Sequence, residues 1–113
     1  MRVSSCVVLL LVAACAREGV DAAATDAWLG DWRGVEGTQL TIAGGQGAYR
    51  ITVRDLDGPR GFDGSAVADG IAFERDGSME TIRVTDGAGT GMKWLTGKRD
   101  CLMIREGEGF CRD

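Results

Sequence analysis

Hydrophobic and polar residues alternate in short runs along most of the chain after Trp28. The clearest run is 48–54, in which Tyr49, Ile51 and Val53 fall on one face and polar or charged residues on the other. A period of two is typical of a β-strand with one buried and one solvated face. The 3.6-residue period of a helix is absent from these runs, so the sequence predicts an all-β domain.

The remaining runs predict further short strands. In chain order they cover 29–35, 38–42, 62–67, 71–74, 80–85, 92–95, 101–104 and 109–112. Asp-Gly pairs at 57–58, 69–70, 76–77 and 86–87 suit tight hairpin turns, because Gly adopts positive φ and Asp tolerates it. Short strands without a helical crossover predict a small antiparallel up-and-down meander, closed or nearly closed into an eight-stranded barrel.

The N-terminus has the order of an export signal. Arg2 precedes an apolar run at 6–12, and two alanines then lead to Cys15. The motif at 12–15, Val-Ala-Ala-Cys, resembles the lipobox of bacterial lipoproteins. This resemblance implies cleavage before Cys15 and lipidation of its side chain and new amino group. An ordinary secretory signal, which would leave Cys15 as a free thiol, is the alternative.

These features divide the chain into three parts. We expect a lipoprotein signal peptide at 1–14, the lipidated cysteine with a flexible tether at 15–27, and a β-barrel domain at 28–113. The lipoprotein resemblance implies a cell-envelope location with a membrane anchor at Cys15. Ala16, rather than Asp, follows the cysteine, which in lipoproteins of the enterobacterial type favours the outer membrane, facing the periplasm.

Export also makes Cys101 and Cys111 a predicted disulfide, because the compartment is oxidising. They are the two cysteines that remain once the signal-peptide cysteine and the lipidated one are set aside. Placing them opposite each other in a hairpin also sets Ile104 opposite Glu108. The connecting loop is then 105–107, with Gly where a left-handed residue is required.

Gly30-Asp31-Trp32 in the first predicted strand resembles the Gly-X-Trp motif of lipocalin-like and avidin-like barrels. The resemblance continues through 36–42. In those barrels the tryptophan plugs one end, so the resemblance implies that role for Trp32. The resemblance implies a barrel fold for this chain but does not imply a ligand.

Charge and composition exclude several functions. The chain has 13 basic and 17 acidic residues, and loss of Arg2 with the signal changes its net charge from −4 to −5. Its basic residues are scattered, so we expect no nucleic-acid partner. The chain lacks His, the usual general base and zinc ligand, and we expect no enzyme activity, metal or cofactor.

Two groups of residues, one aromatic and one acidic, are candidates for a binding site. We expect the aromatic residues to fill the core instead, which leaves room for a small apolar pocket at one mouth of the barrel. These aromatic residues are Trp32, Tyr49, Phe62, Phe73, Trp94 and Phe110. Asp55, Asp57 and Asp63 offer too few oxygen ligands for a calcium loop. We expect a solvated turn there, with Arg54 and Arg60 as charge partners.

The predicted function is a lipid-anchored binding or interaction module of the cell envelope. Its partner would be an envelope protein or a small apolar ligand, and the sequence leaves its identity and the oligomeric state open. The segment 87–98 is predicted to form a loop, a strand and a second loop. In this order it distantly resembles the inhibitory loop of membrane-bound inhibitors of C-type lysozyme. That resemblance implies the alternative, a periplasmic lysozyme inhibitor, with Lys98 and Lys93 as candidate partner contacts.

Overall fold

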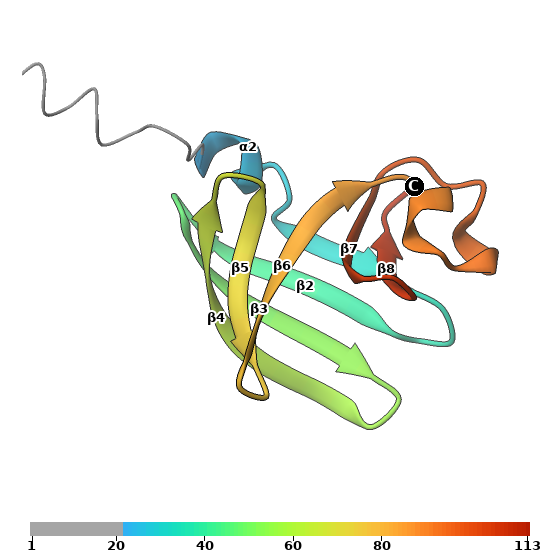
Figure 1. The fold of residues 1–113 in the computed structure, drawn as a ribbon, viewed down its shortest axis with the longest axis horizontal. Coiled ribbons are helices and arrows are strands. Elements are labelled where there is room, and N and C mark those ends of the chain that lie inside the picture. Colours follow the sequence, from blue (N-terminus) through green and yellow to red (C-terminus); the bar gives the residue numbers. More distant parts are fainter. Residues whose placement is uncertain (1–21) are drawn as a thin grey trace, which may run out of the picture.

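The fold is a closed antiparallel barrel of eight strands, each paired with the next along the chain and the last with the first. The computed structural model describes residues 22–113 (Figure 1). The all-β class and the eight-stranded meander are therefore confirmed. The predicted signal peptide and Cys15 lie outside the described residues. Within 22–113, no helix is long and apolar enough to cross a membrane.

A short helix precedes the barrel and two 3-10 turns interrupt it. The elements are α2 (Ala22–Asp26), β1 (Gly30–Arg33), β2 (Gln39–Gly45), β3 (Ala48–Asp55), β4 (Gly58–Val67), β5 (Gly70–Arg75), β6 (Ser78–Thr85), η1 (Ala88–Thr90), η2 (Lys93–Leu95), β7 (Cys101–Arg105) and β8 (Glu108–Cys111).

Inward-facing residues of all eight strands form one hydrophobic core. Its buried members are Trp32, Leu40, Ile42, Tyr49, Ile51, Val53, Ile71, Phe73, Ile82, Leu102, Ile104 and Phe110. Phe62 is partly buried and packs against this core. The expectation that aromatic residues fill the interior is confirmed for all but Trp94, whose surface is 77% exposed.

The strand predicted at 92–95 is wrong, and so is the hairpin turn at 86–87. η2 occupies this place, and Gly87 has a φ of −62° at the start of η1. The chain folds back here, because the amide of Gly87 donates to the carbonyl of Lys98 at 2.8 Å. A Cβ on Gly87 would lie 1.6 Å from the carbonyl oxygen of Leu95, so glycine is required at this close approach.

By contrast, Asp76 and Gly77 in the β5–β6 turn have left-handed backbone conformations, as a tight hairpin turn demands.

The last hairpin contains the predicted Cys101–Cys111 disulfide. The two cysteines lie opposite each other, but Arg105 rather than Ile104 faces Glu108. A bulge between Met103 and Arg105 shifts the register by one residue, which corrects the predicted pairing.

α2 covers one end of the barrel (Figure 1). The Tyr49 hydroxyl donates to Asp26 Oδ1 at 2.6 Å and lies 2.6 Å from Oγ1 of the buried Thr25. The indole of Trp32 donates to the carbonyl of Trp28 at 2.8 Å. The last residues of the predicted tether are thus helical and packed on the barrel rather than flexible; its earlier residues lie outside the described part.

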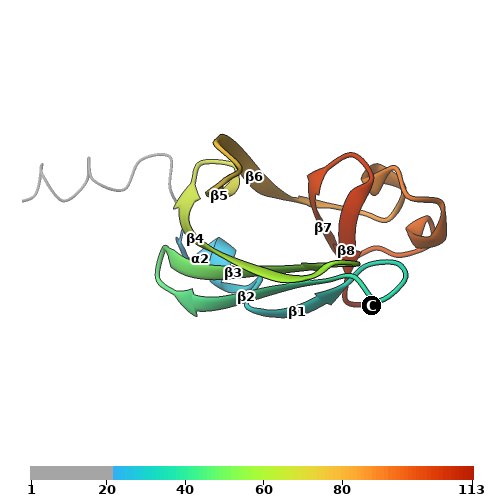
Figure 2. The same cartoon turned by 90° about the horizontal axis from the view of Figure 1, so that it is seen from below.

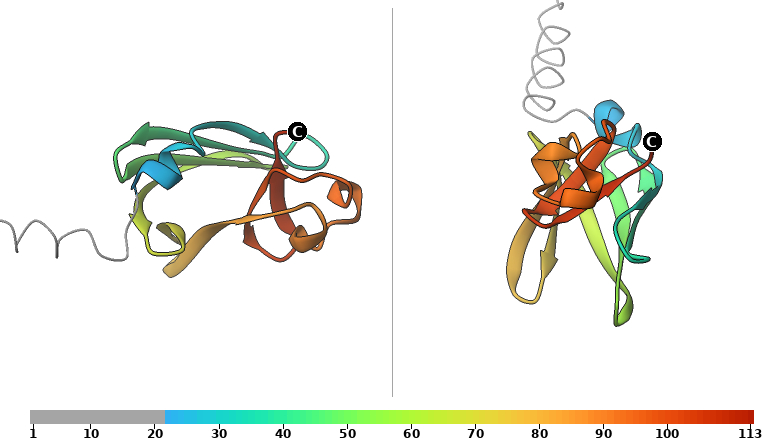
Figure 3. Two further views of the ribbon diagram at one scale, coloured as in Figure 1. Left: turned by 90° about the horizontal axis from the view of Figure 1, so that it is seen from above. Right: turned by 90° about the vertical axis from the view of Figure 1, so that its right-hand side faces the viewer.

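Two of the strand pairings that close the barrel are short. β6 pairs with β7 only from Arg83 to Thr85, and β1 pairs with β8 only through Arg33 and Cys111. Beyond their contact, β6 and β7 diverge (Figures 2 and 3). The end of the barrel that lies away from α2 is therefore open between the hairpins.

Candidate binding site at the open end of the barrel

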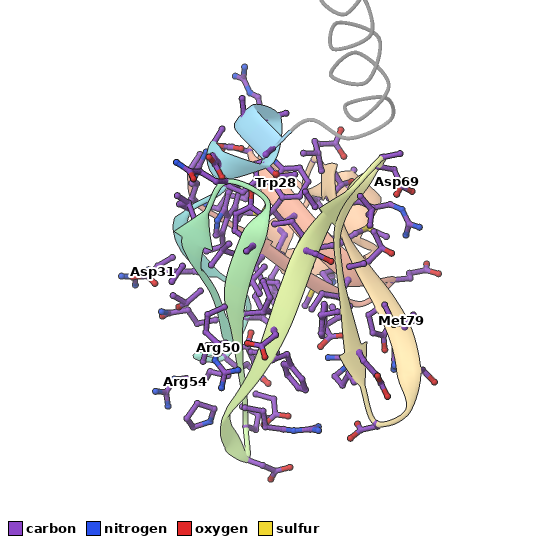
Figure 4. The ribbon with its side chains drawn as sticks, turned by 90° about the vertical axis from the view of Figure 1, so that its left-hand side faces the viewer. Trp28, Asp31, Arg50, Arg54, Asp69 and Met79 are labelled. Atoms are coloured by element: carbon purple, nitrogen blue, oxygen red, sulfur yellow. A yellow bond between two sulfur atoms is a disulfide. The ribbon has the colours of Figure 1, made fainter. Side chains whose placement is uncertain are left out.

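An apolar depression of about 210 Å³ lies at the open end. It is formed by the β1–β2 connection, the end of β3, the link between η1 and η2, and the β7–β8 hairpin. Its lining residues are Val35, Thr38, Val53, Arg54, Asp55, Met92, Gly107, Glu108, Gly109 and Phe110. In Figure 4, Trp28 lies beside α2 and Arg54 lies toward the other end, which shows that the depression and α2 are well separated.

Two further depressions adjoin this one. One, of about 390 Å³, shares Val35 and is otherwise lined by Gly34, Glu36, Trp94 and Leu95. The other, of about 410 Å³, shares Gly107 and Glu108 and is otherwise lined by Arg60, Arg75, Asp76, Arg105 and Glu106. We call these three depressions the open-end groove.

The segment between β6 and β7 is held against the groove by a second, small apolar cluster. Leu95 packs there with the Cys101–Cys111 disulfide, and Val35 and Met92 pack against them. The buried Thr90 adds a polar link, because its carbonyl accepts from the amide of Gly107 at 2.8 Å. The disulfide therefore holds η2 through Leu95, and the hydrogen bond between Gly107 and Thr90 holds η1; together they fix one wall of the groove.

Two large apolar side chains stand exposed beside the groove. Trp94 lines its wall and is 77% exposed, and Leu56 follows the lining residue Asp55 and is 73% exposed. Exposed tryptophan and leucine on two separate loops provide apolar contact area to a partner.

A buried ionic network forms the far wall. Arg75 donates to both carboxylate oxygens of Glu108, at 2.7 and 2.8 Å, and to Glu80 at 3.2 Å. Arg105 also donates to Glu80, through Nε at 3.2 Å and through Nη2. Arg75 and Glu80 are each only 8% exposed, so their charges depend on these partners.

The pKa values of the network follow from these contacts. The hydrogen bond to Glu108 is the main cause that raises the pKa of Arg75, with Glu80 adding to it and burial opposing it. The hydrogen bond from Arg105, followed by that from Arg75, lowers the pKa of Glu80 against an opposing effect of burial. Arg75, Arg105 and Glu80 are therefore charged near neutral pH, and each guanidinium group of the network contacts a carboxylate.

Other charges around the groove have no ionic partner within residues 22–113. Among the residues that line the groove, this group consists of the carboxylates Glu36, Asp55 and Glu106 and the cation Arg54. Asp57, Lys93 and Arg33 lie within two residues of a lining residue and are also without an ionic partner in that part of the chain. Uncompensated charge at the groove is thus mainly negative.

The acidic turn at 55–63 is exposed as expected, but neither of its predicted charge partners, Arg54 and Arg60, forms an ion pair with its carboxylates; only the charge of Asp55 contributes to the raised pKa of Arg60, after the main effect of Asp76. Arg60 pairs with Asp76 at 2.7 Å, and Asp63 pairs with Arg50 at 3.1 Å. The register explains the second pair, because Arg50 faces Asp63 directly across β3 and β4.

The two lysines predicted as partner contacts lie on the segment between β6 and β7. Lys93 Nζ is 5.8 Å from the Trp94 ring, beside the groove. Lys98 instead donates from Nζ to the carbonyl of Asp113 at 2.7 Å and lines a further depression of about 490 Å³, which meets the groove at Gly34 and Leu95. Lys98 therefore lies beside the groove, on a neighbouring depression, with its ammonium group bound at the C-terminal end of the chain.

One group of potential metal ligands occurs in the described part of the chain. It consists of Cys101, Cys111 and Asp113, whose ligand atoms lie within 4.8 Å of one another. Both sulfurs are in the disulfide and are not available as thiolates, so we assign no metal to this group.

Most groove residues carried no signal in the sequence. Val35 ends the predicted strand 29–35 and Met92 begins the predicted strand 92–95, and only the fold of the segment between β6 and β7 brings them together. Trp94 was noted there, but as a core residue. No known protein family, curated protein or solved structure matches the chain.

Proposed function

We propose that this protein is a lipid-anchored binding module of the cell envelope that receives a partner at the open-end groove. The observation that carries the proposal is an apolar depression with two exposed apolar side chains near it, Trp94 in the adjoining wall of the groove and Leu56 next to the lining residue Asp55. Buried aromatic anchors at the centre of an interface supply a large share of binding energy, and tryptophan is enriched among them.

The disulfide supports this proposal because it prepares the groove for binding. It holds Leu95, next to Trp94, in the small apolar cluster. A binding loop that is ordered before the partner arrives loses less conformational entropy on association.

The position of α2 also supports it. In the proposed molecule the lipid on Cys15 anchors the chain, in the outer membrane facing the periplasm. α2 follows this anchor and covers the end of the barrel that lies away from the groove (Figure 1). The groove would then face away from the anchoring membrane, where a protein of the envelope can reach it.

The test is photocrosslinking in living cells. A photoreactive amino acid at position 94 or 56 should give covalent adducts with a defined envelope partner. The matched control is the exposed Ala68, beside Asp69 in the β4–β5 turn (Figure 4). Adducts that are equally frequent at position 68, or absent at both 94 and 56, would refute the proposal.

Inhibition of C-type lysozyme is the more specific alternative. It is favoured by the exposed Lys93 and Trp94 side by side on the segment between β6 and β7. The exported, purified protein should then inhibit C-type lysozyme at micromolar concentration, and Lys98→Ala should weaken inhibition. No inhibition at this concentration removes the alternative and leaves the binding module in place.

A further inference from the structure

We infer that the partner of the open-end groove is a basic polypeptide. One of its apolar side chains enters the depression of about 210 Å³, which we call the central depression because the other two adjoin it, and its Lys or Arg residues contact the carboxylates around it. This inference rests on the proposed function and names the chemistry of the partner. It follows from the volume of the depression and from the sign of the uncompensated charge.

The size of the central depression favours a side chain over a free small molecule. Taken by itself, its volume of about 210 Å³ is below the roughly 300–1,000 Å³ of ordinary ligand pockets. The two adjoining depressions, of about 390 and 410 Å³, give a polypeptide room to continue along the groove on both sides of it. Val35, Val53 and Phe110 give it apolar walls, and Met92 contributes an adaptable thioether side chain. One leucine or phenylalanine side chain of a polypeptide suits such a depression.

The charges around the depression favour a basic partner. Three carboxylates that line the groove, Glu36, Asp55 and Glu106, have no ionic partner in the described chain, whereas Arg54 is the one lining cation without such a partner. The neighbouring groups that this part of the chain also leaves unpaired, Asp57, Lys93 and Arg33, do not reverse this excess of negative charge. The other three arginines of the groove are already bound to carboxylates: Arg60 to Asp76, Arg75 to Glu108 and Arg105 to Glu80. The acidic net charge of the whole chain, −4, adds long-range attraction for a basic protein.

The probes are three labelled heptapeptides of matched length, measured by fluorescence anisotropy with the purified lipoprotein in a neutral detergent. The first is Lys-Lys-Leu-Phe-Leu-Lys-Lys. The second replaces its lysines by glutamates, and the third replaces its Leu-Phe-Leu centre by Ser-Gly-Ser. The first should bind at least tenfold more tightly than either of the others, and added salt should weaken its binding.

Variants of the protein assign this binding to the groove. The double substitution Asp55→Asn with Asp57→Asn should weaken the binding of the first peptide about fivefold, since each exposed ion pair contributes modestly. The control is Asp63→Asn together with Asp69→Asn, which changes the net charge equally at exposed sites outside the groove and should change affinity by less than about twofold. Trp94→Ala should weaken binding about tenfold.

The inference is overturned if the acidic peptide binds as well as the basic one, if the control pair weakens binding as much as the groove pair, or if no peptide binds at millimolar concentration. It is also overturned if the groove instead drives concentration-dependent self-association or binding to vesicles of anionic lipid, each abolished by Trp94→Ala. In all these cases, crosslinks confined to positions 94 and 56 would still uphold the proposed binding site, so the two failures are distinguishable.

Discussion

The guanidinium carbon of Arg112 lies 4.0 Å from the centroid of the Trp32 ring. The same side chain donates to the carbonyl of Ala27 at 3.0 Å and to the carboxylate of Asp100 at 2.9 Å. It thus joins β1, the chain before β1 and the end of the segment that forms the groove wall. Since a single residue pair connects β1 and β8, this one side chain is expected to reinforce the closure of the barrel.

Arg112→Ala should lower the free energy of unfolding by about 1–2 kcal/mol, because it removes a cation–π contact and two charged hydrogen bonds. Arg112→Lys should restore only part of this loss, since an ammonium cannot stack on the indole and donate in both directions. Urea denaturation measures both changes. The control is Arg33→Ala, at an exposed arginine without an ionic partner in the described chain, which should cost less than about 0.5 kcal/mol. Equal losses at 112 and 33 would contradict the assignment.

Removing the disulfide should destabilise the groove more than the opposite end of the barrel. Cys101→Ala with Cys111→Ala should lower the free energy of unfolding by about 3 kcal/mol, because the closed loop spans a sequence separation of 10. It should also release Leu95 from its cluster. Amide hydrogen exchange should therefore accelerate more at 93–96 than at 49–53. A uniform increase across both ranges would mean that the disulfide acts on global stability alone.

The disulfide could be predicted because Cys101 and Cys111 remain once the signal-peptide cysteine and the predicted lipidated cysteine are set aside. Their spacing and the glycine at the turn are local signals that place them opposite each other in a hairpin. The bulge that puts Arg105 opposite Glu108 has no such signal in the local sequence; in the structure it goes together with a long-range contact, the hydrogen bond from Arg105 to Glu80 of β6.

The groove could not be predicted for a related reason. Residues 92–95 alternate like a strand, and only the contact of Gly87 with the Leu95 carbonyl shows that the chain turns back there. The buried charges of the network were also missed. An isolated Arg75 or Glu80 is expected at the surface, and its ionic partners are far away or on another strand.

Tyr49→Phe should loosen α2 while preserving the barrel. The hydroxyl of Tyr49 bonds Asp26 and contacts Thr25, so its loss should cost about 1–1.5 kcal/mol. Amide exchange in α2 should accelerate accordingly. The control is Thr52→Val, which removes a hydroxyl without a side-chain hydrogen bond in the described chain. If exchange in α2 is unchanged in Tyr49→Phe, this hydroxyl does not hold the helix.

The pKa of the Tyr49 hydroxyl leads to a second prediction, a loss of stability at high pH. Burial, and next the hydrogen bond to Asp26, raises the pKa of Tyr49 above its ordinary value of 10.0. A raised pKa in the folded state means that the neutral form is favoured by folding. The corresponding stability is present below pH 10 and is lost as the pH rises through the folded-state pKa. Tyr49→Phe should remove this contribution, so its stability should fall less steeply above pH 10 than that of the wild type.

The buried network predicts the opposite behaviour in acid. Arg105 and Arg75 lower the pKa of Glu80 below its ordinary value of 4.5, so folding favours the ionised form. The stability that Glu80 contributes is therefore present above pH 4.5 and is lost as the pH falls through its folded-state pKa. Glu80→Gln should cost about 2 kcal/mol at pH 7, because Arg75 then loses one of its two carboxylates in a buried site.

The difference between the wild type and Glu80→Gln should shrink in acid, because protonation removes the same charge from the wild type that the variant lacks. Asp76 and Asp113 also have lowered pKa values and stay in the variant, so its own acid profile should be flatter without being flat. Denaturation series from pH 7 to 3 measure the effect. Glu74→Gln, at an exposed carboxylate without an ionic partner in residues 22–113, should run parallel to the wild type. A constant gap between the wild type and Glu80→Gln over this range would show that Glu80 stabilises the barrel by its shape and not by its charge.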